Sequence, residues 1–325
     1  MTIDLKIWIF FTFVELNAYM NKFFLSIFII LISNIAFSQS KFLKSGNIGT
    51  VAKTQPASKK LYGPVDFREL GEMIGEKFIV MPKSKSVQRY GYQDIYRENS
   101  KSVTDHLSYN DGVGLVLSLA QIKGRDGVFQ DSLGNKYTST VSNCQFSDLA
   151  PMRDLKEAEE LFLHKSLWVK DHSLNTYDAR SGETGQIHNV RLTRVTVEEI
   201  AVGTEDQAPV RFILKTASGK IGYRDVNMSG SNLSYNYRQF YSFHNTFWTY
   251  NPKAKYKFSP QIWKLIANQE AKIGMTTQQV KLSLGEPDEV NYSEYKSGTQ
   301  EQWMYGSGSN RSYYYFQNGR LTGQN

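Results

Sequence analysis

The sequence is poor in the residues that build disulfides. It has one cysteine, Cys144, among 325 residues. A disulfide within the chain is therefore excluded, and no cysteine stands where an exported protein is lipidated. A lone cysteine flanked by strand-forming residues is usually a small buried apolar side chain, so we expect Cys144 to lie in a core.

Histidines are also few, and their spacing does not indicate a site. None of the five forms the His-Glu-x-x-His pattern or another zinc spacing. The chain has no Gly-x-Ser-x-Gly nucleophile turn and no phosphate-binding loop. We therefore predict a non-enzymatic protein with no catalytic residue, no cofactor and no metal. A hydrolase in which a histidine approaches Cys144 in space remains the enzymatic alternative.

Blocks of basic residues are missing too. The chain has 38 Lys and Arg against 31 Asp and Glu, a net charge of +7, but no Lys/Arg block typical of a nucleic-acid site. Nucleic acid is therefore not an expected partner. The modest positive charge serves solubility, or it gives weak attraction to peptidoglycan and anionic lipid head groups.

Only the N-terminus is apolar over a long run. Lys22 is followed by the apolar residues 23–32 and by Ala36-Phe37-Ser38, the pattern of a secretory signal peptide cleaved after Ser38. We predict that residues 1–38 are this signal, with Met20 as the true start. We expect export to the periplasm, or to the periplasmic face of the outer membrane, of a Gram-negative bacterium. A retained membrane anchor is the alternative.

Tyrosine and other strand-forming residues are abundant and indicate a β-rich α+β protein. After a flexible leader at residues 39–60, similar patterns recur in a first β unit at 61–155 and a second at 156–257. Turn glycines, Gly134 and Gly219, stand at corresponding points. Each copy holds short strands with hairpin turns, which predicts two SH3-like or β-roll units. Generic hairpin spacing is the alternative.

Two further patterns lie in the second unit. Residues 154–163 predict a short helix, whose Glu157, Glu159 and Glu160 we expect on a solvated face. Residues 235–258 are rich in aromatic side chains, which include Trp248 and Tyr250. This cluster is either a platform for cell-wall or glycan ligands or the packed junction with the next domain.

The last part of the chain has clear helix boundaries. Ser259-Pro260 fits the start of one helix, and Gly274 its end. Thr276 and Gln279 fit a capping box at the start of a second helix, and Gly285 fits its end.

Strands follow these two helices. Residues 301–305 alternate, residues 313–316 are all aromatic, and Asn318-Gly319 is a strong hairpin signal. We therefore predict a compact α-α-β-β-β domain over residues 258–325.

This domain resembles the small outer-membrane lipoprotein family called SmpA/OmlA or BamE, which has a beta-lactamase-inhibitor-like fold. The matching segments are Gly274-Met275-Thr276, Val280, Leu284-Gly285-x-Pro287, Gln302-Trp303-x-Tyr305 and Phe316-x-Asn318-Gly319-x-Leu321. The resemblance covers about a fifth of the chain. It implies an accessory scaffold role in the assembly of outer-membrane barrels.

We therefore expect a docking or scaffold protein of the envelope, whose C-terminal sheet presents aromatic side chains to a protein partner. Components of the barrel-assembly machinery are candidate partners. The candidate contact residues are Trp303, Tyr305, Tyr313 and Arg320. The competing function is a cell-wall or glycan binding module that uses the SH3-like units together with Trp248 and Tyr250.

Overall fold

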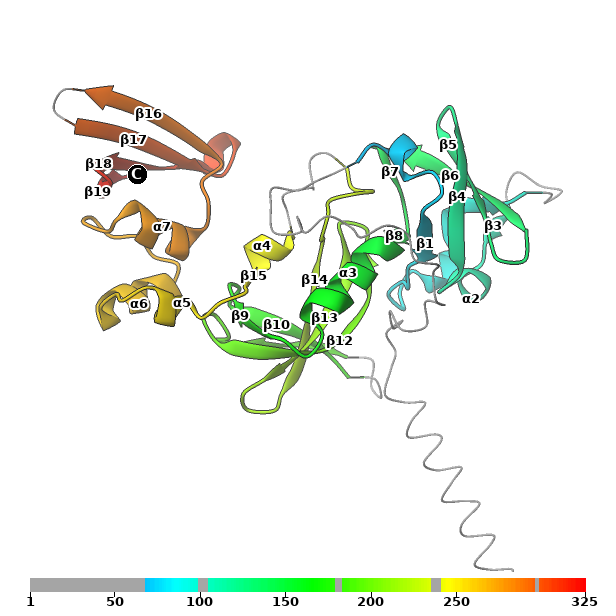
Figure 1. The fold of residues 1–325 in the computed structure, drawn as a ribbon, viewed down its shortest axis with the longest axis horizontal. Coiled ribbons are helices and arrows are strands. Elements are labelled where there is room, and N and C mark those ends of the chain that lie inside the picture. The colour runs from blue at the N-terminus through cyan, green and yellow to red at the C-terminus, as the bar shows by residue number, and fades with distance from the viewer. Residues whose placement is uncertain (1–67, 99–104, 179–182, 235–240, 296–297) are drawn as a thin grey trace, which may run out of the picture.

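The computed structural model describes residues 68–98, 105–178, 183–234, 241–295 and 298–325. The predicted signal peptide, the leader and part of the aromatic cluster lie outside these residues. The described chain is β-rich: nineteen strands form antiparallel sheets, accompanied by short helices. Figure 1 shows three units in a row, in chain order.

The first unit is built on an eight-stranded sheet with the order β3-β2-β6-β5-β4-β1-β8, from which β7 branches by pairing with β6. A short helix, α2 (Tyr109–Gly112), connects β3 to β4. The strands are β1 (Lys77–Val80), β2 (Tyr92–Arg97), β3 (His106–Leu107), β4 (Val116–Lys123), β5 (Asp126–Gln130), β6 (Lys136–Ser142), β7 (Gln145–Phe146) and β8 (Leu149–Pro151).

The second unit is built on a seven-stranded sheet with the order β11-β10-β14-β13-β12-β9-β15. Helix α4 (Phe243–Thr246) immediately precedes its last strand. The strands are β9 (Ser166–Val169), β10 (Ser173–Tyr177), β11 (Thr184–His188), β12 (Arg194–Glu205), β13 (Ala208–Thr216), β14 (Ile221–Val226) and β15 (Phe247–Trp248).

The two sheets have the same strand order, position by position. In each, a three-stranded meander (β4-β5-β6 or β12-β13-β14) is flanked on one side by the first strand of the unit and on the other by a hairpin. The last strand returns to pair with the first. Gly134 and Gly219, at φ 86° and 82°, occupy the matching turns. The equivalence falls on the two stretches where the sequence predicts a duplication.

Strand β1 and helix α3 (Met152–Phe162) join the two units. Phe78 and Val80 of β1 face the first core, whereas Ile79 belongs to the second core. The predicted helix at 154–163 is confirmed as α3, but Glu157 corrects the expectation of a solvated face. Its side chain is buried between the units and bonds Arg153 at 3.3 Å.

The third unit has helices α5 (Pro252–Lys255), α6 (Pro260–Ala267) and α7 (Thr277–Leu284). The predicted helix starts are confirmed: the Ser259 side chain accepts from Ile262 N, and Thr276 and Gln279 form a capping box. Gly285, at φ 93°, ends α7 as predicted.

The predicted end of α6 is wrong. The helix stops at Ala267, and the chain turns at Gln269, at φ 58°, not at Gly274. The hydrogen bond from Glu270 N to Leu265 O (2.9 Å) pairs a free carbonyl of the last helical turn, so the helix ends before the chain reaches Gly274. Gly274 turns the chain into α7 instead.

The C-terminal sheet has four antiparallel strands and not the predicted three. Asn318-Gly319 forms the predicted hairpin turn, with positive φ at both residues. The additional strand is β16, a mostly polar segment that is exposed along its length. The strands, in the order in which they pair, are β16 (Glu289–Tyr295), β17 (Gly298–Tyr305), β18 (Ser312–Gln317) and β19 (Arg320–Gln324).

Cys144 is exposed, which corrects the expectation of burial. It forms the two-residue turn between β6 and β7 together with Asn143, at φ 64° and 49°. Such a turn projects its side chains from the end of the hairpin.

The helices among the described residues are all too short or too polar to span a lipid bilayer.

Candidate functional site

Trp303 lies in the core of the C-terminal domain and is only 2% exposed. Its ring packs on Phe316, with ring centroids 4.4 Å apart, and its Nε1 donates to Glu301 Oε2 at 2.9 Å. The residue is therefore a structural tryptophan. This corrects its prediction as a partner contact, because α6 and α7 cover the face of the sheet on which it stands.

The other three predicted contact residues do not form one surface. Tyr305 lies on the same face as Trp303 and donates its hydroxyl to Gly285 O at 3.0 Å, and burial raises its pKa. Tyr313 pairs with Met304 on the opposite face of the sheet. Arg320 is exposed and donates to Gly274 O at 3.1 Å.

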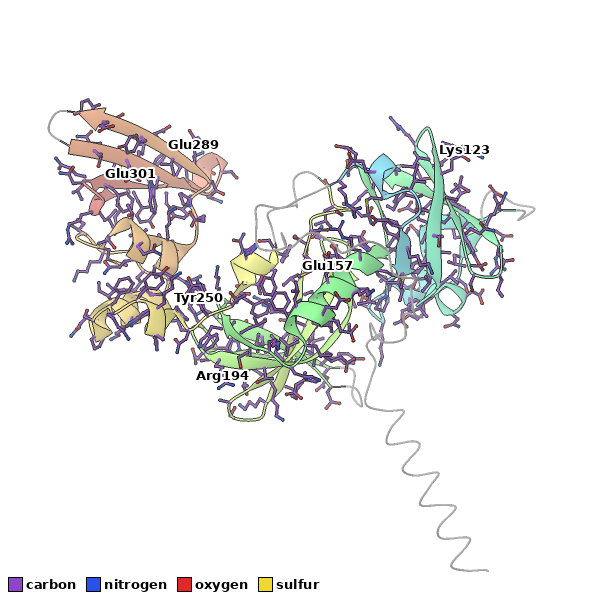
Figure 2. The ribbon with its side chains drawn as sticks, in the orientation of Figure 1. Lys123, Glu157, Arg194, Tyr250, Glu289 and Glu301 are labelled. Carbon is purple, nitrogen blue, oxygen red and sulfur yellow. The ribbon has the colours of Figure 1, made fainter. Side chains whose placement is uncertain are left out.

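Three of the exposed apolar side chains of this domain lie on β16; the other two in the described residues are Ile273 and Tyr315. Val290 is 46% exposed, and Tyr292 and Tyr295 are each 56% exposed. Val290 pairs with Trp303 and Tyr292 with Glu301, so these two side chains share the face that the helices cover farther along the sheet. Figure 2 shows Glu289 and Glu301 on the neighbouring strands β16 and β17. The helical layer leaves this end of the sheet uncovered.

The two edges of the C-terminal sheet differ. The outer edge of β19 is tied to the segment before α7 by two hydrogen bonds of 2.8 Å, Gly274 N to Leu321 O and Leu321 N to Met275 O. At the other edge, β16 pairs with β17 alone among the described residues. One edge of the sheet is therefore closed and the other is open.

The open edge is acidic. Residues 286–295 contain four acidic side chains and no Lys or Arg. Glu286 pairs with Lys281 at 2.6 Å, and Asp288 accepts from Gly306 N at 2.7 Å. Glu289 and Glu294 stand on the exposed strand itself. The edge therefore combines aromatic side chains with negative charge.

Trp248 and Tyr250 pack in one hydrophobic cluster with residues of the C-terminal domain. Figure 2 shows Tyr250 between the second unit and that domain. Trp248 is 6% exposed, which favours the packed junction over the ligand platform for this residue. Tyr250 is half-buried against Tyr256, and burial raises its pKa to about 12. The part of the aromatic cluster from Trp248 to Phe258 is thus a packed junction.

Arg191 holds this junction together. Its guanidinium lies 5.9 Å from the Trp248 ring centroid, and burial lowers its pKa to about 10. The C-terminal ends of α6 and α7 carry partial negative charge, which suits a buried cation. Arg191 donates to four main-chain carbonyl oxygens, those of Lys170, Ile266, Leu282 and Ser283.

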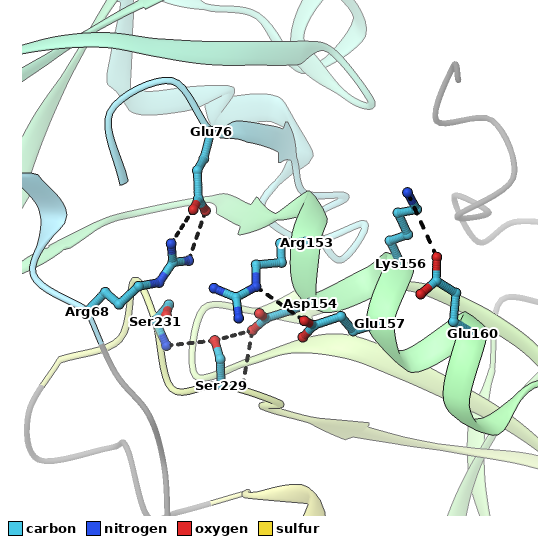
Figure 3. A network of polar contacts seen from close by, with 9 residues as sticks. All are labelled: Arg68, Glu76, Arg153, Asp154, Lys156, Glu157, Glu160, Ser229 and Ser231. Atoms are coloured by element: carbon cyan, nitrogen blue, oxygen red, sulfur yellow. Dashed lines mark hydrogen bonds and ion pairs between the residues drawn. The ribbon is translucent and has the colours of Figure 1, made fainter. Parts of the chain in front are cut away.

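A second buried polar network joins the first two units (Figure 3). Asp154 on α3 accepts from Ser229 N at 3.2 Å and from Ser229 Oγ at 2.7 Å. Burial raises its pKa to about 6. Asp206, which accepts from Asp148 N at 2.7 Å, also has its pKa raised by burial to about 6. Each carboxyl accepts a main-chain N–H from a distant part of the chain at the junction. We therefore assign both carboxyls a structural role.

A pocket of about 420 Å³ opens on the first unit. Arg89 and His106 contribute basic side chains to the lining of the pocket, and Leu107 is a buried residue of the same lining. None of the described residues that line it is acidic. Sequence analysis did not identify this site, because its two lining segments are separate in the chain. The pocket is lined by Gln88, Arg89, Tyr90, Gly91, His106, Leu107, Ser108, Tyr109 and Asn110.

Within the described ranges, no three His, Cys, Asp or Glu side chains gather closely enough to hold a metal ion. Cys144 stands at a hairpin turn on the surface.

Neither a scan of family models nor a search of curated proteins finds a match to this chain.

Proposed function

We propose that this protein is a non-enzymatic docking or scaffold protein of the bacterial envelope, with its partner surface on the C-terminal domain. One observation carries the proposal. The open edge of the sheet exposes Val290, Tyr292 and Tyr295 beside a tightly packed core. Aromatic side chains on a rigid support are typical anchors of protein interfaces.

The BamE-like identity of this domain is part of the proposal. The order of two capped helices followed by an antiparallel sheet with an Asn-Gly hairpin supports it. The additional strand β16 differs from the expected three-stranded pattern. The SH3-like character of the first two units is likewise proposed. In each unit it is supported by a three-stranded meander and by the pairing of the unit's first strand with its last.

The proposed cellular location rests on the N-terminal sequence pattern. A signal peptide over residues 1–38 would deliver the protein to the periplasm, where the C-terminal domain would meet outer-membrane barrels or their assembly machinery. Because one fold can serve many functions, the partner has to be identified in the cell. The proposal is therefore tested in cells.

The experiment is crosslinking in intact cells, with a tag placed after residue 38, followed by mass spectrometry of the membrane fraction. We expect outer-membrane barrel or assembly proteins to be recovered, and to be lost when Val290, Tyr292 and Tyr295 are all changed to Ser. Leu133→Ser is the matched control, because Leu133 is 86% exposed on a turn of the first unit. Equal recovery from the triple variant and the control would contradict this docking surface.

The pocket of the first unit favours a second candidate function, binding of a cell-wall fragment or an anionic head group. Its basic side chains and its lack of acidic ones suit such a ligand. Cosedimentation with purified peptidoglycan, and separately with anionic vesicles, tests this candidate. We expect the double variant Arg89→Gln, His106→Gln to lose binding and the β16 triple variant to keep it. The opposite result would reject the pocket.

A further inference from the structure

Strand β16 is built like an acceptor for another strand. It is seven residues long, exposed throughout, and pairs with β17 in continuous register from Glu289 to Tyr295. Proteins usually protect such edges with proline, lysine, a bulge or a covering segment. Strand β16 contains no proline and no lysine, and its register shows no bulge.

The opposite edge of the same sheet, formed by β19, is protected. There, β18 and β19 pair through a register shift, and the segment from Gly274 to Thr277 bonds to β19. Thr277 N donates to Gly319 O at 3.1 Å as part of this cover. In the described chain, nothing equivalent lies against β16.

The side chains of β16 indicate what kind of strand would fit. Val290 and Tyr292 project on the helix-side face next to Trp303 and Glu301, yet both remain about half exposed. A strand added at this edge would place alternate side chains directly beside them, at the spacing of cross-strand pairs. Apolar residues at those alternate positions would complete the face.

Charge decides between a partner and a second copy of this chain. Glu289 and Glu294 stand on β16 itself, which contains no Lys or Arg, and Asp288 directly precedes it, whereas Glu286 is paired with Lys281. Pairing of two copies through β16 would bring both acidic sets together, which is unfavourable. A partner segment with Lys or Arg between its apolar residues would be attracted instead.

We propose that β16 binds an extended segment of a partner protein by strand addition, and that this segment alternates apolar residues with Lys or Arg. The inference rests on the proposed docking function and specifies its chemistry. Main-chain hydrogen bonds to the free edge supply affinity, whereas Val290, Tyr292 and the acidic side chains select the sequence.

The test uses the full chain and two synthetic nine-residue peptides, one alternating Lys and Val and the other alternating Glu and Val. Amide hydrogen exchange by NMR is the readout. We expect the Lys-Val peptide to slow exchange at every second amide of β16, because outward-pointing N–H groups alternate with those bonded to β17. We expect the Glu-Val peptide to bind at least about tenfold more weakly.

Two kinds of variant sharpen the test. The charge reversal Glu289→Lys, Glu294→Lys should transfer the preference to the Glu-Val peptide. Asn291 and Tyr292 are neighbours on β16, so their N–H groups point to opposite sides of the strand. Of the variants Asn291→Pro and Tyr292→Pro, one therefore removes an N–H bonded to β17 and the other removes an outward N–H. The variant that keeps the wild-type melting temperature should be the one that fails to bind the Lys-Val peptide.

Strand addition is rejected if the Lys-Val peptide protects no β16 amide, if both peptides bind equally, or if sedimentation shows dimers joined through β16. These outcomes are separable from failure of the docking function. Cellular crosslinks that still depend on Val290, Tyr292 and Tyr295 would keep the docking surface and reject only the strand mechanism. Peptide protection without such crosslinks would reject the envelope docking role instead.

Discussion

At the scale of single residues, local backbone geometry decides the environment of Cys144. The sequence around it alternates like a strand, which favours burial, but Asn143 and Cys144 both adopt positive φ and turn the chain. Asparagine is common in such turns, so Asn143 is the residue in the sequence that indicates a turn here. The cysteine is therefore displayed at the end of a hairpin.

We expect a thiol-reactive probe to label Cys144 in the native protein at nearly the rate seen in denaturant, because its side chain is exposed. Stopped-flow labelling with and without urea measures the two rates. Labelling that is a hundredfold slower in the native state would place the thiol in a core and contradict the turn.

Buried carboxyls give a second prediction at this scale. Burial raises the pKa of Asp154 from 3.8 to about 6. Between these values the native state holds a proton that the unfolded state has lost. The free energy of unfolding should therefore fall as pH rises from about 4 to 6 and stay lower above pH 6.

Asp154→Asn should remove this loss while still accepting the two hydrogen bonds from Ser229. We expect the variant to be more stable than wild type at pH 8, by at most about 3 kcal/mol, and nearly equal at pH 4. Urea unfolding at pH 4, 6 and 8 measures this, with the exposed Asp105→Asn as control. A destabilised Asn variant at pH 8 would show that the negative charge itself stabilises the junction.

At the scale of elements, sequence signals succeed where a structural rule is local. The capping box of α7 and the Asn318-Gly319 turn are satisfied by neighbouring atoms, so the printed residues suffice to predict them. Strand β16 was missed because none of its residues is buried. A strand at the edge of a sheet needs no apolar alternation when only its main chain pairs.

The turn before β2 offers a prediction about an element boundary. Gly91 has φ 61°, and a Cβ there would lie 2.6 Å from Leu107 O, at the base of the pocket. Gly91→Ala should therefore destabilise the first unit by about 2 kcal/mol or more, through both backbone strain and displacement of β3.

Gly124→Ala is the matched control, because Gly124 has φ 63° but open space around its Cβ position. The control should show only the cost of the backbone conformation, on the order of 1 kcal/mol. Thermal unfolding of both variants measures the difference. Equal losses would mean that the contact with Leu107 relaxes without cost.

At the scale of the whole molecule, the three units are joined by polar groups that bridge distant parts of the chain. Asn232 accepts from Phe146 N at 2.6 Å and donates to Phe146 O and Leu149 O at 2.9 and 2.7 Å. Arg191 joins the second unit to the C-terminal helices in the same way. Neither residue stands in a motif that sequence analysis singles out.

Arg191→Met should loosen the C-terminal domain from the second unit, because four carbonyl oxygens lose their donor. We expect a loss of about 3 kcal/mol at this junction and release of a C-terminal fragment by limited proteolysis. Arg194→Met is the control, since Arg194 is exposed and donates to the Ser166 hydroxyl within its own unit. Equal proteolysis of the two variants would show that apolar packing around Trp248 is sufficient.

The sequence by itself determined the features that depend on neighbouring residues: β-rich composition, helix starts, tight turns and the stretches in which the strand pattern recurs. Only the tertiary structure decided which face of the C-terminal sheet α6 and α7 cover, and hence that Trp303 is core while Val290 and Tyr292 are exposed. The physical reason is that alternation along a strand distinguishes its two faces but does not say which one is buried. That choice depends on helices and edges placed by contacts across the whole domain.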